Sequence, residues 1–394
     1  MHNVTESRSC HVCSGSNLEY VFEAPGLPLT GLYIRDDMSA EVPRYDQALM
    51  YCMDCGHGQL RNLIPAELLY DSTYTHRTSS SPIATRGNDF FSDQLKVITN
   101  GRKYKSLLEV GCNDLYLLHK CQDLADHLVG VDPIWAGRDH ALNSKTKVLG
   151  GFVEDIVVGT HIDTAPDLII SAHTFEHIHD LYGQFSRLVD IAADGCIFVI
   201  EMPCFETAVR LRRFDQVFHQ HIQYLSLSSM RRLVERLGCS FIGHVFNHHY
   251  WGGTLMFWFE KRRAKTSVGK SGHEPLQLQN VTKAYSEFRD ALGSAHEQAV
   301  SLKETCFGFG AAQMLPILAY HMESDLGFMQ AILDDNQERW MSRLPGVKPL
   351  IRGLQENELT DAAVMITALD SARPIVKRLL GLNPRRILYP LHNF

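Results

Sequence analysis

Between residue 85 and about residue 260, short apolar runs alternate with stretches in which apolar residues recur at helical spacing. This alternation is typical of a parallel β-sheet whose strands are joined by crossover helices. We therefore predict strands at Ser106–Val110, Leu128–Val131, Asp167–Ser171 and Cys196–Ile200.

Two more strands are expected where this segment ends. The runs Phe241–Val245 and Leu255–Phe259 are separated by a turn signal near Gly252 and Gly253. Such a pair would suit the antiparallel edge that often closes a mostly parallel sheet. The following stretch, Lys261–Pro275, is polar and rich in Lys, Gly and Ser, and indicates a linker.

The last third of the chain repeats the βα pattern. Apolar residues in the segment 276–303 fall close to helical spacing, which predicts one long helix. The runs Cys306–Gly310 and Met329–Leu333 follow, and a final apolar run begins at Arg386. A second domain of α/β type is therefore expected behind the linker.

Composition narrows the class of protein. Of the 394 residues, 45% are hydrophobic and 21% are charged, and the net charge is −7, so we expect a soluble globular protein without a nucleic-acid partner. The sequence has no apolar run of about 18 residues, which predicts no membrane contact. The polar N-terminus lacks a signal-peptide pattern, and the ten cysteines then indicate reduced thiols in the cytoplasm.

Four of these cysteines form two C-x-x-C pairs, separated by 38 residues. Each pair can sit on a tight turn with both sulfurs pointing inward, and two such turns give a tetrahedral site for a structural Zn²⁺. We predict the ligands to be Cys10, Cys13, Cys52 and Cys55. His11 and His57 lie beside the pairs, but four sulfurs already complete the coordination shell. Four unrelated buried thiols are the alternative.

A cofactor site is indicated at the first predicted strand. Glu109, Gly111, Cys112 and Asn113 lie at its end, where glycine lets the backbone approach a ligand. The next strand ends some 20 residues later at Asp132, an acid that can accept hydrogen bonds from ribose hydroxyls. The turn does not carry the G-x-G-x-x-G spacing of dinucleotide enzymes.

The form E-x-G-x-N resembles motif I of class I methyltransferases, which bind S-adenosylmethionine. That resemblance implies that Glu109 and Asn113 contact the methionine half of the cofactor and Asp132 its ribose. Relatives usually carry a second glycine where this chain has Leu115. Four further residues are expected around the cofactor: Pro133 after the acid, Ala172 and His173 near the sulfonium, and Phe152 near the adenine, although Phe152 could equally be a core aromatic.

The segment Phe214–Ser226 is densest in candidate chemistry. If it is extended, His219 and His221 lie on the same face. A neutral imidazole can take a proton near pH 7, so either ring could be a general base. Metal binding is the rival interpretation, but no nearby carboxylate or third histidine completes a ligand set. Solvated or core histidines remain a third possibility.

Taken together, these segments resemble the sugar C-methyltransferase family, which adds a methyl branch to nucleotide-linked 4-keto-6-deoxyhexoses. The matching stretches cover most of the chain and are Cys52–Leu60, Glu109–Asp114, Phe175–Ile178, Val199–Pro203, Phe214–His221, Gly252–Leu255 and Gly308–Ala311. The resemblance implies an α/β protein with a zinc-binding domain at 1–70, a class I methyltransferase domain with a Rossmann-like core at 71–262, and a second Rossmann-like domain at 276–394.

The resemblance also implies a mechanism, in which a base removes a proton next to a ketone and the enolate carbon takes the methyl group. The last histidine of the family's Y-H-E-H motif is the favoured base, and it corresponds to His221. His219 and Gln220 belong to the same motif, in which Gln220 replaces a glutamate and Phe218 a tyrosine. Tyr74 and His76 correspond to a substrate-facing Y-x-Y-x-S segment, in which His76 replaces a tyrosine.

Other departures fall where substrate should lie. The family's H-G-G-S-x-R has lost its His and Arg at Trp251–Met256, and G-Y-G-A-x-A-K has lost its Lys at Gly308–Met314. Three alternatives therefore stay open: methyl transfer to another small metabolite, a cofactor-binding protein that does not turn over, and an oxidoreductase built on Gly308, Gly310 and Asp334. The oligomeric state stays undetermined.

Overall fold

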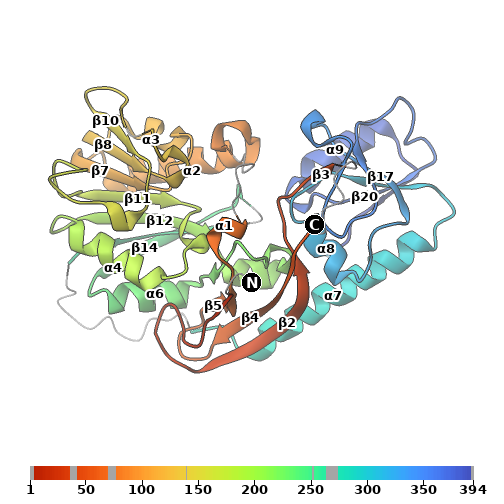
Figure 1. Ribbon diagram of the computed structural model, residues 1–394, viewed down its shortest axis with the longest axis horizontal. Helices are drawn as coiled ribbons and strands as arrows, with labels where there is room; N and C mark the ends of the chain where they lie inside the picture. The colour runs from red at the N-terminus through yellow and green to blue at the C-terminus, as the bar shows by residue number, and fades with distance from the viewer. Residues whose placement is uncertain are drawn as a thin grey trace.

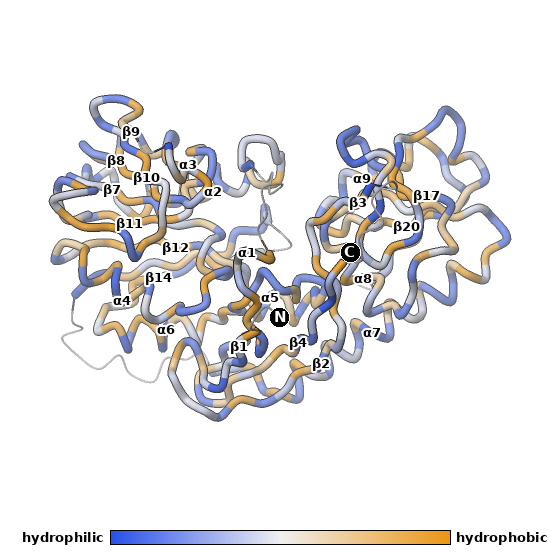
Figure 2. The backbone as a smooth tube through the Cα atoms, in the orientation of Figure 1, coloured by the Kyte–Doolittle hydropathy of each residue, from blue (hydrophilic) through white to orange (hydrophobic). Residues whose placement is uncertain are grey.

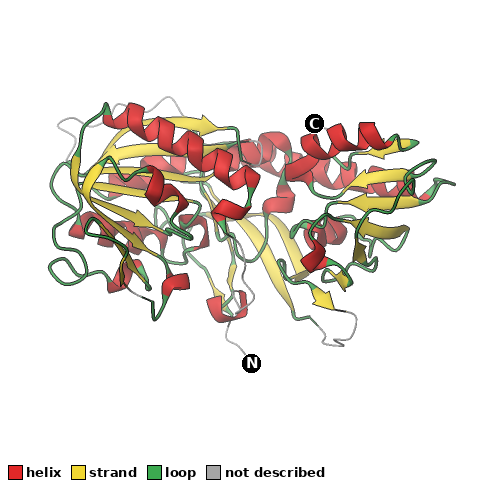
Figure 3. Cartoon of the chain, turned by 90° about the horizontal axis from the view of Figure 1, so that it is seen from above, coloured by secondary structure: helices red, strands yellow, loops and turns green. Residues whose placement is uncertain are grey.

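The computed structural model describes residues 4–35, 42–69, 77–138, 140–250, 253–262 and 274–391. Two α/β parts lie at opposite ends of the molecule, and the N-terminal strands β2 (Leu18–Pro28) and β4 (Arg44–Cys52) lie between and beneath them (Figure 1). Seen from above, the strands of the two parts are again separated along the long axis (Figure 3). None of the described helices has the length and apolar character needed to cross a membrane.

The larger part is built on an eight-stranded sheet in the order β14-β15-β12-β11-β7-β8-β10-β9. Its strands are β7 (Tyr104–Val110), β8 (Ala125–Val131), β9 (His140–Ala141), β10 (Thr146–Leu149), β11 (Leu168–Ala172), β12 (Ile197–Pro203), β14 (Ser240–Asn247) and β15 (Thr254–Glu260). Strands β12, β11, β7, β8 and β10 run parallel, and β14 and β15 form the predicted antiparallel edge. The predicted α/β class is confirmed.

The apolar runs of this sheet are continuous because helices cover both of its faces. Side chains such as Leu108 pack with helices α4 (Leu181–Ile191) and α6 (Leu227–Arg236). The neighbouring Leu107 faces the other way, toward α2 (Pro82–Thr99) and α3 (Tyr116–Lys120). The hydropathy colouring follows this arrangement, with hydrophobic colour along the strands of the sheet (Figure 2).

The C-terminal part is a smaller, wholly parallel sheet in the order β19-β17-β16-β20-β21. Its elements are α7 (Leu278–Val300), β16 (Cys306–Phe309), α8 (Leu315–His321), β17 (Met329–Leu333), β19 (Ile351–Arg352), β20 (Ala363–Ile366), α9 (Ala372–Leu382) and β21 (Arg386–Leu388). The long helix and the strands predicted from periodicity are confirmed. The second Rossmann-like domain is therefore present.

The N-terminal segment forms a four-stranded antiparallel sheet in the order β13-β5-β4-β2. Its strands are β2 (Leu18–Pro28), β4 (Arg44–Cys52), β5 (Gly58–Leu60) and β13 (Gln223–Tyr224). The last strand comes from the segment in which the sequence placed the candidate chemistry. The N-terminal sheet and that segment thus form one structural unit, although about 160 residues separate β5 from β13 in the sequence.

Shorter elements complete the fold: β1 (Thr5–Glu6) pairs with β6 (Asn62–Leu63), and β3 (Ile34–Arg35) pairs with β18 (Ser342–Arg343) of the C-terminal part. Two other short helices are α1 (Ala66–Leu69) and α5 (Phe205–Leu211). One hydrophobic core runs from Phe22 on β2 through Phe288 on α7 to Ile332 on β17. The N-terminal and C-terminal parts therefore share a core, and the predicted boundary at residue 70 remains a prediction.

A buried charge cluster joins the two α/β parts. Arg213 Nε lies 2.7 Å from Asp215 Oδ1, and its Nη2 lies 2.6 Å from Asp370 Oδ1, which follows β20. The side chains of Arg213 and Asp215 are only 9% and 1% exposed. A single guanidinium thus balances two carboxylates at the junction between the parts.

Replacing this arginine should be costly. Arg213→Ala leaves two carboxylates in a buried site without their counter-charge, which is expected to lower the free energy of unfolding by about 3–5 kcal/mol. Urea unfolding measures the change. Arg232→Ala is the control, because that arginine is half exposed in an ion pair with Glu235 and should change stability by less than about 1 kcal/mol. Equal effects of the two variants would contradict the proposed balance of charges.

Candidate functional site

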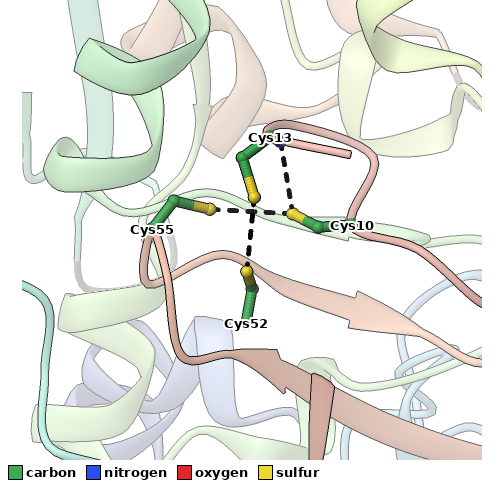
Figure 4. Close-up of side chains that lie close together, drawn as sticks. All are labelled: Cys10, Cys13, Cys52 and Cys55. Carbon is green, nitrogen blue, oxygen red and sulfur yellow. Dashed lines mark hydrogen bonds between the residues drawn. The ribbon is translucent and has the colours of Figure 1, made fainter. Parts of the chain in front are cut away.

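The four predicted zinc ligands converge on one point (Figure 4). Cys10 Sγ lies 3.6 Å from Cys55 Sγ, Cys13 Sγ lies 3.5 Å from Cys52 Sγ, and all four sulfurs lie within 4.8 Å of one another. The thiols are free rather than joined in disulfides, and three of the four residues are buried. This donor set fits a closed, structural zinc site.

The two neighbouring histidines do not compete for the metal position. His57 Nε2 and His11 Nδ1 both bond the Gln223 side chain, at 2.9 and 3.1 Å. Because Gln223 lies on β13, these bonds fasten the segment of candidate chemistry to the cysteine turns. The two cysteine turns thus help to hold that segment in place.

Removing one sulfur ligand should release the metal. Cys10→Ser is expected to lower the zinc content from about one ion per chain to well below that, with a lower midpoint of unfolding, because binding of a structural zinc stabilises the folded state. Zinc is measured by atomic emission on the purified protein. Cys239→Ser is the control, since this buried cysteine lies outside the cluster. A metal-free wild type of equal stability would refute the Cys₄ site.

A cavity of about 1240 Å³ lies between the two α/β parts. It is bordered by residues at the carboxyl ends of β7, β8 and β11 and, from the C-terminal part, by those of β16, β17 and β20. Crevices at the carboxyl ends of parallel strands are the usual ligand sites of such sheets. Every predicted cofactor residue lines this cavity: Glu109, Gly111, Cys112, Asn113, Asp132, Pro133, Phe152, Ala172 and His173.

A loop and an acid form a first cradle, which we define as Gly111, Asn113 and Asp132. Gly111 has φ +75°, and a Cβ at this position would overlap the Oγ1 of Thr174. Asp132 Oδ2 accepts a hydrogen bond from the Asn113 amide at 2.9 Å, so the acid holds the loop. Leu115, which replaces the family's second glycine, takes a left-handed φ of +68° at a cost of about 1–2 kcal/mol. The turn therefore keeps the glycine conformation without the glycine.

Glu109 lies beside this cradle, on the cavity wall and almost fully buried. Burial raises the pKa of its carboxyl well above the usual range, and the nearby Asp132 and Asp114 raise it further. Its Oε2 has no hydrogen-bond partner among the described residues. A buried polar atom of this kind indicates a place for a ligand donor. Phe152 is 60% exposed at the cavity, so it is not a core aromatic.

A histidine cluster, which we define as His173, Glu176, His177 and His221, occupies the next part of the site. His173 Nδ1 donates to Glu176 Oε1 at 3.3 Å, and the His177 and His221 rings lie 5.0 Å apart. Burial, together with the neighbouring His177, lowers the pKa of His221 to about 3, so this ring is neutral at pH 7. Burial opposes ionisation of Glu176, but the hydrogen bond from His173 and the neighbouring histidines lower its pKa to about 2.

The structure corrects two expectations about this segment. His219 and His221 do not share a face: the His219 ring donates to the Leu27 carbonyl at 3.1 Å and lies outside the cavity lining, whereas His221 lines the cavity. The residues between them form a loop rather than a strand, so alternation does not apply. The sequence also indicated no carboxylate or third histidine near the pair. In the structure, a Glu176 carboxylate oxygen and a His177 ring nitrogen lie within 4.8 Å of a His221 ring nitrogen.

Three other candidates remain predictions without support from the cavity. Gln220 does not line it; its side chain accepts from Thr30 Oγ1 at 3.1 Å and donates to the Leu69 carbonyl at 3.0 Å. Tyr74 and His76 lie outside the described residues. The sequence analysis gave no role to His177, although the matching stretch Phe175–Ile178 contains it.

The C-terminal part contributes a second cradle, which we define as Gly310, Ala311 and Asp334. Gly310 has φ +95°, and a Cβ there would overlap Ala368. Asp334, at the end of the neighbouring strand, accepts from the Ala311 amide at 2.7 Å through Oδ2. Gly310 and Asp334 line the same cavity as Gly111 and Asp132. Two glycine-and-acid cradles therefore open onto one space.

Comparisons with known proteins agree with this architecture. A family model described as "Methyltransferase domain" matches residues 84–243, and one described as "Putative zinc binding domain" matches residues 10–70. The C-methyltransferase NovU of Streptomyces niveus is 25% identical over 258 residues, which cover 63% of this chain and 59% of that protein. The resemblance to the sugar C-methyltransferase family is confirmed. The match spans somewhat under two thirds of the relative's own length.

Two methyltransferases are among the solved structures that match part of this chain. The N-methyltransferase NodS from Bradyrhizobium japonicum WM9, in complex with S-adenosyl-L-homocysteine, is 17% identical with a TM-score of 0.37, covering 50% of this chain and 94% of that one. The magnesium protoporphyrin IX methyltransferase of Synechocystis PCC 6803 with bound SAM is 10% identical with a TM-score of 0.35, covering 50% and 89%.

Proposed function

We propose that this protein is an S-adenosylmethionine-dependent methyltransferase that methylates a carbon next to the ketone of a nucleotide-linked keto-deoxysugar. One observation carries the proposal: a cofactor cradle, the three histidines of the cluster and a second nucleoside-type cradle line a single cavity. The methyl donor and the nucleotide that carries the acceptor can then bind on either side of the base. The methyltransferase-domain match and the named C-methyltransferase relative support this assignment.

The first cradle suits the cofactor. The positive φ of Gly111 lets the backbone approach a ligand, Asp132 stands where ribose hydroxyls bind, and the exposed Phe152 ring can stack on adenine. The orphaned Oε2 of Glu109 offers an acceptor to the ammonium of the methionine half. When bound, the cofactor supplies a methyl group made electrophilic by its sulfonium.

The second cradle suits the nucleotide of the acceptor. Asp334 repeats the geometry of Asp132, which places an acid where a second ribose would bind. The Arg339 guanidinium lines the same wall and bonds Asp334 at 3.4 Å, so a cation is available to a diphosphate. In this arrangement the sugar extends from the second cradle toward the histidine cluster.

His221 is the proposed base. Its ring is neutral, lines the cavity and lies 4.2 Å from the ring of Phe218. On attack, the C–H bond next to the ketone breaks, the proton moves to a His221 ring nitrogen, and the electron pair forms the enolate. Preorganised donors around the ketone oxygen would stabilise that charge. His177 Nδ1 donates to the Gln220 carbonyl at 2.8 Å, which fixes the ring beside His221.

The test is incubation with labelled S-adenosylmethionine and a panel of nucleotide-linked keto sugars, read by mass spectrometry. A product heavier by one methyl, with the label on a carbon next to the ketone, is expected. His221→Ala should lower turnover by about 10²–10⁴-fold while the affinity for S-adenosylhomocysteine stays unchanged. His119→Ala, an exposed histidine, is the control. Label on oxygen or nitrogen, or normal turnover of His221→Ala, would overturn the mechanism.

The first cradle makes a separate prediction about cofactor affinity. Gly111→Ala should weaken S-adenosylhomocysteine binding by at least about tenfold, because its Cβ would overlap Thr174 and force the loop away from the ligand. Calorimetric titration measures the affinity. Gly137→Ala is the matched control: its φ is +72°, but a Cβ there meets nothing within 4 Å. If both variants bound the ligand like wild type, the cradle would not be the cofactor site.

A further inference from the structure

Glu176 is a wholly buried carboxylate to which the proposed mechanism assigns no role. It lies in the short 3₁₀ turn Phe175–His177 after β11, with 0% exposure. Its backbone carbonyl accepts a hydrogen bond from the Ile222 amide at 2.7 Å, which ties this turn to the loop carrying His221. Its Oε2 has no hydrogen-bond partner among the described residues. A buried carboxylate that is fixed in this way and has a free acceptor oxygen points to a role in the site.

The neighbours of this carboxylate are histidines. A carboxylate oxygen of Glu176 and ring nitrogens of His177 and His221 all lie within 4.8 Å of one another, and His173 donates to Oε1. Burial opposes ionisation of this carboxyl, but the hydrogen bond from His173 and the nearby His177 and His221 rings lower its pKa. Glu201 of β12 and Tyr250 are further titratable groups that interact electrostatically with this carboxylate.

Burial opposes the charge of such a carboxylate, and the hydrogen bond from His173 helps to offset that cost. A positive charge that develops beside the carboxylate would stabilise it further. Proton abstraction by His221 creates an imidazolium within a few ångströms of the carboxylate. The attraction is strong in a buried site, and it exists only after the proton has moved. The arrangement therefore favours the state that follows proton transfer.

We propose that Glu176 is a positioning residue that fixes His173 and His221 and stabilises the His221 imidazolium as it forms. This inference rests on the proposed function, because it assigns the partner of the proposed base. The proton passes from the acceptor carbon to His221, and the C–H electron pair enters the enolate. The enolate carbon then takes the methyl group while the sulfur keeps the electron pair of its bond. Glu176 stays ionised throughout and exchanges no proton.

Glu176→Gln tests the charge with little change in shape. With an acceptor identified in the panel, kcat should fall by about 10²-fold while KM and S-adenosylhomocysteine affinity stay unchanged. The isotope effect from deuterium at the acceptor carbon should rise, because proton transfer becomes slower than methyl transfer. Glu176→Asp should recover part of the rate. Glu235→Gln, 70% exposed, is the control. An unchanged isotope effect with reduced kcat would overturn the assignment and leave a structural role.

A second measurement needs no acceptor. In protein with ¹⁵N-labelled histidine, Glu176→Gln should move protonation within the histidine cluster to lower pH, since the carboxylate stabilises the imidazolium form. Identical titrations of wild type and variant would overturn the proposal even if methyl transfer is established. A failed sugar panel with a shifted titration would instead overturn the proposed acceptor alone. A second metal ion per chain, lost in Glu176→Gln, would make the cluster a metal site and refute the counter-charge role.

Discussion

The position of His221 depends on an antiparallel pairing between two segments that are far apart in the sequence. Gln223 and Tyr224 pair with Gln59 and Gly58 of β5, directly after the second cysteine turn. The Gln223 side chain bonds His11 and His57, which flank the cysteines. The metal that closes those turns therefore acts at a distance on the cavity, because it fixes the strand against which the histidine segment is registered. A structural zinc can thus matter for the reaction without touching it.

The cavity has two similar halves facing each other. In each, a glycine with positive φ follows a buried strand, and the acid of the next strand accepts a hydrogen bond from the glycine loop. Parallel sheets place such loops at the carboxyl ends of their strands, which is why we propose one site for the methyl donor and one for the nucleotide of the acceptor. The charge cluster of Arg213, Asp215 and Asp370 holds the halves together. In the proposed function, the methyl donor and the nucleotide of the acceptor then bind on either side of the histidine cluster.

Much of this could be predicted from local pattern. The strands are predictable because they are buried on both faces and therefore continuously apolar. The spacing of Gly111 and Asp132 picks out residues that line the cavity, and their role in cofactor binding stays a prediction. The histidine segment was misjudged because alternation applies only to a strand, and Val217–Ile222 forms a loop whose shape is set by bonds to distant residues. Local pattern could not predict that Glu176 and His177 belong to the site, because His221, which they lie beside, is 44 or more residues away in the sequence.

The departures from the family's motifs also look different in three dimensions. Met314 stands where the resemblance implies a lysine, yet the cavity wall beside it carries Arg339 from a different element. That guanidinium bonds the Ala311 carbonyl and Asp334, so it is oriented by the second cradle itself. A cation that enters the same space from another element can serve the same anion, because recognition depends on where the charge lies and how it is held. Loss of the motif lysine therefore does not argue against a diphosphate-bearing acceptor.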